Sequence, residues 1–285
     1  KQEKERYNVP RKVQDVIPVR RIWPDGIFLV GNKFSKTYKF SDINYLVASR
    51  EDKESMFLTY SELLNSLDSG AVTKITINNR RMNQANFETS ILMPMQGDFR
   101  DEYRKEYNQM LLDKATGANG ITQEKYITIS VVKKDIEEAR AYFARVGADL
   151  ISHFAALGSK CVELDATERL RILHDFYRQG EESEFVFNAR EMMKRGHSFK
   201  DYICPDSLEF ESDYFKIGNR YGRVIFLREY ASYIKDSMVA ELTDMNRNLM
   251  MSIDIVPVPT DEAVKEAENL SLIHISEPTR QEAIS

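Results

Sequence analysis

The stretch YITISVVKKDIEEARAYFARVGADLISHFAALG (residues 126–158) carries the clearest secondary-structure signal in the chain and decides its fold class. Its first residues alternate between polar and apolar side chains, and this period of two predicts a β-strand over residues 126–132. From Ile136 onward, apolar residues recur every three or four positions, which predicts a long amphipathic helix that stops at Gly158. Such a helix buries its apolar face against a sheet, so the stretch predicts an α+β fold.

The segments on either side repeat the same order of elements. Residues 160–164 predict a returning strand, and Asp165 followed three residues later by Glu168 predicts a capping box at the start of a helix that runs to Gly180. The other predicted elements are strands at residues 26–30, 36–40, 73–77, 223–230 and 251–256, and helices at residues 52–67, 101–117 and 233–248. We therefore expect repeated strand-helix-strand units with helices packed on mixed sheets.

With 285 residues the chain is long enough for two domains. We expect an N-terminal α/β module at residues 22–200 and a second strand-helix-strand module at residues 201–269. The irregular stretch FKDYICPDS (residues 199–207) is the expected boundary between them.

Residues 1–21 form a basic N-terminal arm. Its basic residues are Lys1, Lys4, Arg6, Arg11, Lys12, Arg20 and Arg21, and its acidic residues are Glu3, Glu5 and Asp15. Two interpretations remain open: a solvated tail, or a segment that lies on anionic lipid headgroups.

The composition excludes several classes of protein. A net charge of -5 argues against a basic nucleic-acid footprint over the whole chain, and no run of apolar residues is long enough to cross a bilayer. The chain has two cysteines, Cys161 and Cys204, far apart in sequence, so we expect two buried thiols rather than a disulfide framework or a zinc site.

Motifs that suggest chemistry are all near misses. GIFLVGNK (residues 26–33) resembles a phosphate-binding loop, but Asn32 separates Gly31 from Lys33, and a strand precedes the turn. The histidines, His153, His174, His197 and His274, have no metal-ligand spacing. Carboxylates in DIEEAR and DATERL stand where helices begin, so helix capping explains them better than acid–base catalysis. We therefore assign no catalytic, cofactor-binding or metal-binding residue.

Several long strings together resemble one family, the conjugal-transfer ATPases of type IV secretion systems (the VirB/TraE/TrbE group), in the form carried by conjugative elements of Gram-positive bacteria. The strings are VQDVIPVRRIWPDGIFLVGNKFSKTYKFSDINY, EDKESMFLTYSELLNSLDSG, YRKEYNQMLLDKATGANG, EEARAYFARVGADL, FKDYICPD and YGRVIFLREYASYIKDSMVAELTDMNRNLMMSIDIVPVPTDEAVKE. The resemblance covers residues 8–268, which is nearly the whole chain.

The resemblance implies a function for this region. It would be the non-catalytic docking module that precedes a RecA-like ATPase domain, at the cytoplasmic face of the membrane and peripherally associated with it. Its partners would be inner-membrane channel subunits and other ATPases of the secretion system, and the full-length protein would be a homo-oligomer that needs ATP and magnesium. The Walker motifs of that motor lie downstream in the family, so no catalytic position is carried over to this chain.

Two other functions remain open. One is a stand-alone adaptor or scaffold of a conjugation machine without ATPase activity. The other is binding of single-stranded DNA, for which NNRRMNQANF (residues 78–87) is the candidate because Arg80, Arg81 and Phe87 combine positive charge with an aromatic ring.

The last residues have a different origin in our interpretation. LSLIHISEPTRQEAIS (residues 270–285) departs from the family pattern and resembles the in-frame translation of a transposase-based sequencing adapter. We expect these residues not to be native, and the chain to be part of a longer gene. A natural divergent tail is the alternative.

Overall fold

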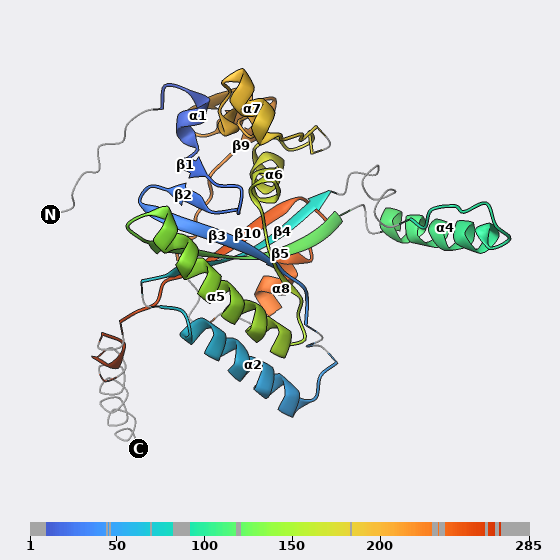
Figure 1. Ribbon diagram of the computed structural model, residues 1–285, viewed down its shortest axis with the longest axis horizontal. Helices are drawn as coiled ribbons and strands as arrows, with labels where there is room; N and C mark the ends of the chain where they lie inside the picture. Colours follow the sequence, from blue (N-terminus) through green and yellow to red (C-terminus); the bar gives the residue numbers. More distant parts are fainter. Residues whose placement is uncertain are drawn as a thin grey trace, which may run out of the picture.

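A seven-stranded sheet forms the centre of the computed structural model (Figure 1). The structure describes residues 10–43, 45, 47–68, 70–81, 92–117, 121–182, 184–229, 233, 237–259, 262–265 and 268. Along the sheet the strands follow the order β1-β2-β3-β5-β4-β10, and β6 also pairs with β3. Their bounds are β1 Val19–Ile22, β2 Phe28–Val30, β3 Lys33–Phe40, β4 Val72–Arg81, β5 Ile121–Val132, β6 Cys161–Glu163 and β10 Leu249–Ile255.

The α+β class is confirmed, but the sheets are not mixed, because every pairing between described strands is antiparallel. The predicted strand-helix-strand units explain the difference. β3 and β4, joined through helix α2 (Arg50–Asn65), both pair with β5, which lies between them. β5 and β6, joined through helix α5 (Ile136–Ala156), both pair with β3. Each unit thus has a strand of opposite direction inserted between its own two strands.

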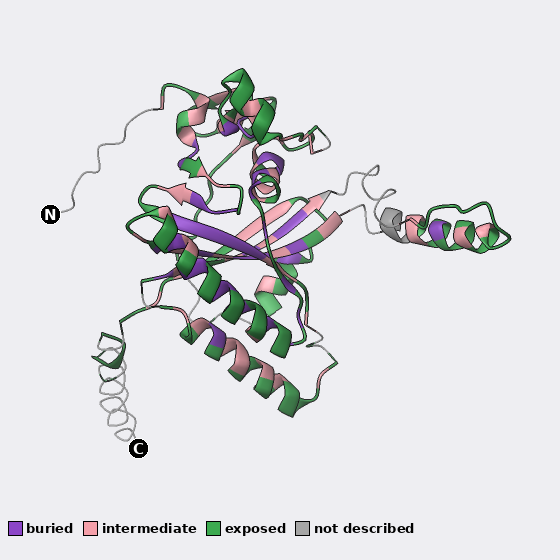
Figure 2. Ribbon diagram, viewed as in Figure 1, coloured by how far each residue is buried: buried purple, intermediate pink, exposed green. Residues whose placement is uncertain are grey.

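One face of the sheet packs against α5, and α2 packs on α5 in turn. Most of the buried residues of this core come from β3, β5 and the inner face of α5, which Figure 2 shows in purple. They include Phe34, Tyr38, Ile127, Ile129, Phe143 and Leu150. Gly147 permits the close approach of α5, because a Cβ at this position would lie 2.8 Å from the Tyr38 hydroxyl. The side chain of Asp135 caps the helix by accepting a hydrogen bond from the Glu138 N–H at 2.9 Å.

A second hydrophobic cluster corrects the predicted division into an arm and two modules. It brings together helix α1 (Val13–Val16), β1, helix α6 (Ala166–Tyr177) and the 3-10 helix η1 (Phe199–Tyr202). Ile17 and Val19 of the predicted arm are buried there beside Ile203. The predicted boundary at residues 200 and 201 falls inside η1. Residues 13–21 therefore belong to the fold, whereas residues 1–9 lie outside the described part of the chain.

Arg169 fastens α6 to the β2–β3 hairpin. Its guanidinium donates to the carbonyl oxygens of Gly26 and Ser35, each at 2.7 Å, and lies 4.0 Å from the centre of the Phe28 ring. Burial lowers the pKa of Arg169 to about 9. The predicted capping box at the start of α6 is confirmed, with Asp165 and Glu168 exchanging hydrogen bonds.

The remaining elements correct two predictions. Helices α4 (Asp101–Gly117), α7 (Ala189–Arg195) and α8 (Ser237–Thr243) and a small sheet of β7 (Leu208–Phe210), β8 (Phe215–Ile217) and β9 (Arg220–Gly222) complete the described elements. The strand predicted at residues 223–230 is wrong for its described part, since residues 223–229 join neither sheet. The helix predicted at residues 233–248 covers only Ser237–Thr243 among its described residues. β10 lies beside β4, so the predicted second module contributes a strand to the main sheet.

No helix in the described part of the chain has both the length and the apolar character to cross a membrane.

Candidate functional site

The stretch that resembles a phosphate-binding loop is a β-hairpin. Phe28 pairs with Ser35 and Val30 with Lys33, so the backbone that a phosphate cradle would need is part of an antiparallel ladder. Gly26 has a positive φ of 79°, and a Cβ there would lie 2.0 Å from the Leu164 carbonyl oxygen. This glycine is therefore required by packing. The hairpin does not fit the triphosphate and magnesium of an ATPase.

The described histidines, His153, His174 and His197, each contact a neighbouring residue. His174 is buried, with Nδ1 3.3 Å from the Asp175 carboxylate and its ring 5.0 Å from that of Phe185. Nδ1 of His153 lies 2.8 Å from the carbonyl oxygen of Asp149, and Nδ1 of His197 lies 3.7 Å from the Asp201 carboxylate. Across the described residues, no three potential metal ligands of the His, Cys, Asp and Glu types come together. His274 lies outside the described residues.

The two cysteines are free and buried, as predicted. Burial, with a smaller contribution from Glu163, raises the pKa of Cys161 to about 11. Burial also raises the pKa of Cys204. Both side chains are therefore thiols at neutral pH, which is the unreactive form.

The predicted DNA-binding stretch does not present Arg80 to solvent. The Nε of Arg80 donates to Glu124 at 2.8 Å, and Nη1 donates to Asp175 at 3.4 Å. Lys39 donates to the same Glu124 carboxylate at 2.6 Å, as does the Tyr126 hydroxyl. Arg80 is thus neutralised in a largely buried network. Phe87 and the side chain of Arg81 lie outside the described part of the structure.

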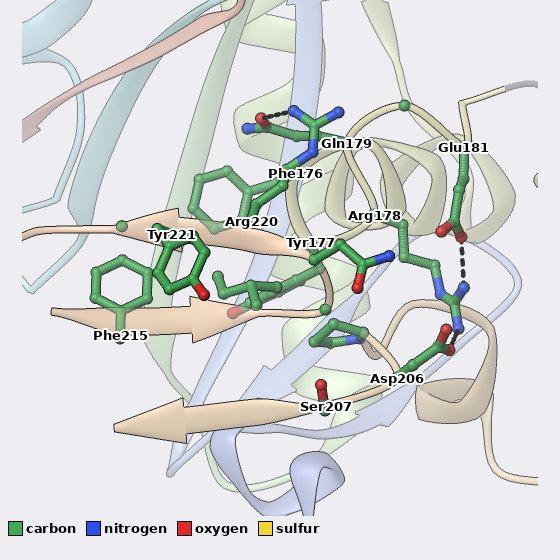
Figure 3. A pocket seen from close by; sticks show the side chains of 16 residues that line it. Phe176, Tyr177, Arg178, Gln179, Glu181, Asp206, Ser207, Phe215, Arg220 and Tyr221 are labelled. Carbon is green, nitrogen blue, oxygen red and sulfur yellow. Dashed lines mark hydrogen bonds and ion pairs between the residues drawn. The ribbon is translucent and has the colours of Figure 1, made fainter. Parts of the chain in front are cut away.

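A pocket of about 900 Å³ lies between the C-terminal end of α6 and the sheet β7–β9 (Figure 3). Arg178 forms one wall, and its guanidinium donates to Glu181 and Asp206, each at 2.5 Å, and to the Cys204 carbonyl oxygen at 2.8 Å. These two carboxylates neutralise Arg178. Its contacts therefore connect α6 to the segment after η1 rather than offering a free cation.

Arg220 forms the opposite wall and contacts the end of α6. Its Nη1 donates to the Gln179 side chain at 3.3 Å, as Figure 3 shows. Gly180 makes room for this contact, because a Cβ there would lie 2.8 Å from Nη2 of Arg220. A cation at a helix C-terminus interacts favourably with the exposed carbonyl groups. The contact between Arg220 and Gln179 thus connects β9 to α6. Tyr221 and Phe215 also line the pocket with their aromatic rings.

An exposed apolar segment (Val224–Leu227, sequence VIFL) follows β9 after Arg223. These four consecutive side chains are between 73% and 87% exposed. Soluble proteins rarely expose such a run unless it contacts another molecule. The strand-forming composition of this segment is visible in the sequence. The sequence does not show that the segment pairs with no described strand.

Three polar residues of helix α4, Asp101, Arg104 and Asn108, bond with the loop that precedes the helix. Asn108 is buried and bonds with both the N–H and the carbonyl oxygen of Met93, at 2.8 and 2.9 Å. Arg104 bonds with Asp98 and Asp101, and Asp101 accepts from the Gly97 N–H at 2.7 Å.

The exposed surface of α4 carries aromatic side chains among charged ones such as Glu102, Lys105 and Glu106. We define the α4 aromatic face as Tyr103, Tyr107 and Met110, which follow one another at spacings of four and three residues and are all exposed. Figure 1 shows α4 lying apart from the central sheet. The helix predicted at residues 101–117 was expected without this face, although its spacing is present in the sequence.

Neither a known protein family nor a curated protein matches this chain.

Proposed function

We propose that this chain is the non-catalytic docking region of a conjugal-transfer ATPase of a type IV secretion system. The resemblance described above supports the family, and the α4 aromatic face supports docking as the role. In the full-length protein a downstream motor domain would bind ATP and magnesium, and this region would attach that motor to the secretion channel.

The α4 aromatic face is the observation that carries the docking role. In an ordinary surface helix the apolar stripe faces the core and the charged residues face solvent. In α4, Asn108, Arg104 and Asp101 bond with the loop that precedes the helix, and the rings of Tyr103 and Tyr107 are exposed. Tyrosine rings supply large contact area with little loss of side-chain entropy, which is why they anchor protein interfaces.

The partners that suit this face are proteins of the secretion machine. We propose inner-membrane channel subunits and other ATPases of the system, with the chain held peripherally at the cytoplasmic face of the membrane. The basic residues of the N-terminal arm would assist by attraction to anionic headgroups.

The test is a mating assay with the full-length gene in its conjugative element. Tyr103→Ala with Tyr107→Ala should lower transfer at least tenfold and abolish the two-hybrid signal with the channel subunits, because the anchors of the interface are removed. Tyr233→Ala is the matched control, since Tyr233 and Tyr103 are both 70% exposed. Transfer at the normal frequency in the double variant would refute docking through α4.

A further inference from the structure

The apolar segment has the composition of a β-strand, but its backbone is not paired with a described strand. β-branched and aromatic residues such as Val224, Ile225 and Phe226 favour strands. Among the described residues, no backbone hydrogen bond involves residues 223–227. Unpaired N–H and carbonyl groups beside exposed apolar side chains are the features with which a peptide adds to a sheet edge.

The outer edge of β10 is the complementary feature. β10 is the last strand of the seven-stranded sheet and pairs with β4 on one side only within the described structure. Its sequence, LMMSIDI, contains neither lysine nor proline, the residues that commonly protect an open edge, and Asp254 is its one charged residue. The same chain therefore carries an unpaired strand-forming segment and an unpaired edge.

We propose that the apolar segment of one copy of this chain adds as an antiparallel strand to β10 of a second copy, and that the reverse contact closes a two-fold dimer. A two-fold arrangement repeats the same contact twice and leaves neither feature unpaired. This self-association is separate from the docking function proposed above, since it uses neither the α4 aromatic face nor a channel subunit.

One register satisfies both the apolar and the charged residues. With Ile225 opposite Ser252, Val224 lies opposite Ile253 and Arg223 opposite Asp254. In β10, Ile253 pairs with Ile75 and Met251 with Ile77, so Val224 and Phe226 would extend an existing apolar row. Directly opposed residues share a face of the sheet, which places Arg223 beside the Asp254 carboxylate. Antiparallel pairing also matches the pairings of the main sheet.

Light scattering during size-exclusion chromatography tests the dimer on the whole chain. At micromolar concentration the wild-type protein should have twice the mass of one chain. Val224→Asp should shift it to the monomer, since a desolvated carboxylate opposes pairing. Val186→Asp is the matched control, because Val186 is 76% exposed and Val224 77%. The control should remain a dimer, and circular dichroism should show both variants folded.

Cysteine cross-linking tests the register and the second copy together. Ile225→Cys and Ser252→Cys chains, purified separately, mixed and oxidised, should form one covalent heterodimer, because opposed Cβ atoms are within disulfide reach. Cys161 and Cys204 are buried and do not compete. A monomeric wild type would overturn the proposal. So would a disulfide that forms only within one chain when both cysteines are in the same molecule, since the segment would then pair with its own β10.

Discussion

At the scale of single residues, Glu124 is an ionised group held by several partners in the interior. Its carboxylate is almost fully buried and accepts hydrogen bonds from Lys39, Arg80 and Tyr126. Burial alone would raise its pKa, but the charge of Arg80 and the hydrogen bonds outweigh burial and lower the pKa from 4.5 to about 2. The network joins β3, β4 and β5, and through Asp175 it also reaches α6.

Glu124→Gln should therefore lower the free energy of unfolding at pH 7 by about 3 kcal/mol, because it removes the charge that Arg80 and Lys39 surround. The folded pKa lies below the unfolded one. The stabilisation is thus fully present above about pH 4.5 and is lost as the pH falls toward 2. Urea unfolding between pH 7 and pH 3 measures this loss, which the variant should lack.

Glu54→Gln is the control for this experiment, because Glu54 pairs with Arg50 on the exposed surface of α2. It should change stability by less than about 1 kcal/mol at every pH. Equal effects of the two substitutions would mean that the Glu124 network contributes no more than a surface pair.

At the scale of elements, the β2–β3 hairpin shows how backbone packing rather than ligand binding can require a glycine. Gly26 and Gly31 both have positive φ, at 79° and 60°. They differ in their surroundings, since the space around Gly31 is open and Gly26 lies against the Leu164 carbonyl oxygen. The first glycine brings the hairpin against the start of α6, whereas the second only permits the turn.

Gly26→Ala should cost more than about 3 kcal/mol of unfolding free energy, because the new Cβ collides with backbone that cannot move alone. Gly31→Ala should cost only about 1 kcal/mol, the strain of a left-handed alanine. Thermal unfolding of the two variants compares them directly. Similar melting temperatures would show that the backbone at Leu164 moves away from the new Cβ without loss of stability.

At the scale of the whole molecule, the sheet separates two hydrophobic clusters. α5 covers one face. On the opposite face Arg169 of α6 donates to Ser35, and Ile172 and Leu173 line a cavity of about 390 Å³ together with Ser35 and Thr37. The second cluster joins residues near both ends of a long sequence interval, from Ile17 to Ile203. Removing the N-terminal arm therefore exposes part of a core.

Ile17→Ala and Ile203→Ala should each cost about 2–4 kcal/mol, because both side chains are buried. The double variant should cost less than the sum, since the two residues belong to one cluster. Urea titrations of the four proteins measure this coupling. A neutral Ile17→Ala would instead show that the arm folds separately from η1 and α6.

The sequence by itself determined the elements whose pattern is local. The strand and helix of residues 126–158, the capping box at Asp165 and the hairpin that excludes a phosphate loop were all predicted from spacing and turn residues. Each of these depends on neighbours within about one or two helical turns, and such interactions are encoded in adjacent residues.

Only the tertiary structure decided which elements lie together. The insertion of β5 between β3 and β4, the burial of Ile17 beside Ile203 and the pairing of Arg80 with Glu124 join residues far apart in sequence. The composition of residues 223–230 predicted a strand, yet the described residues 223–229 pair with no strand. A strand needs a pairing partner as well as the right residues, and which segments pair depends on the whole chain.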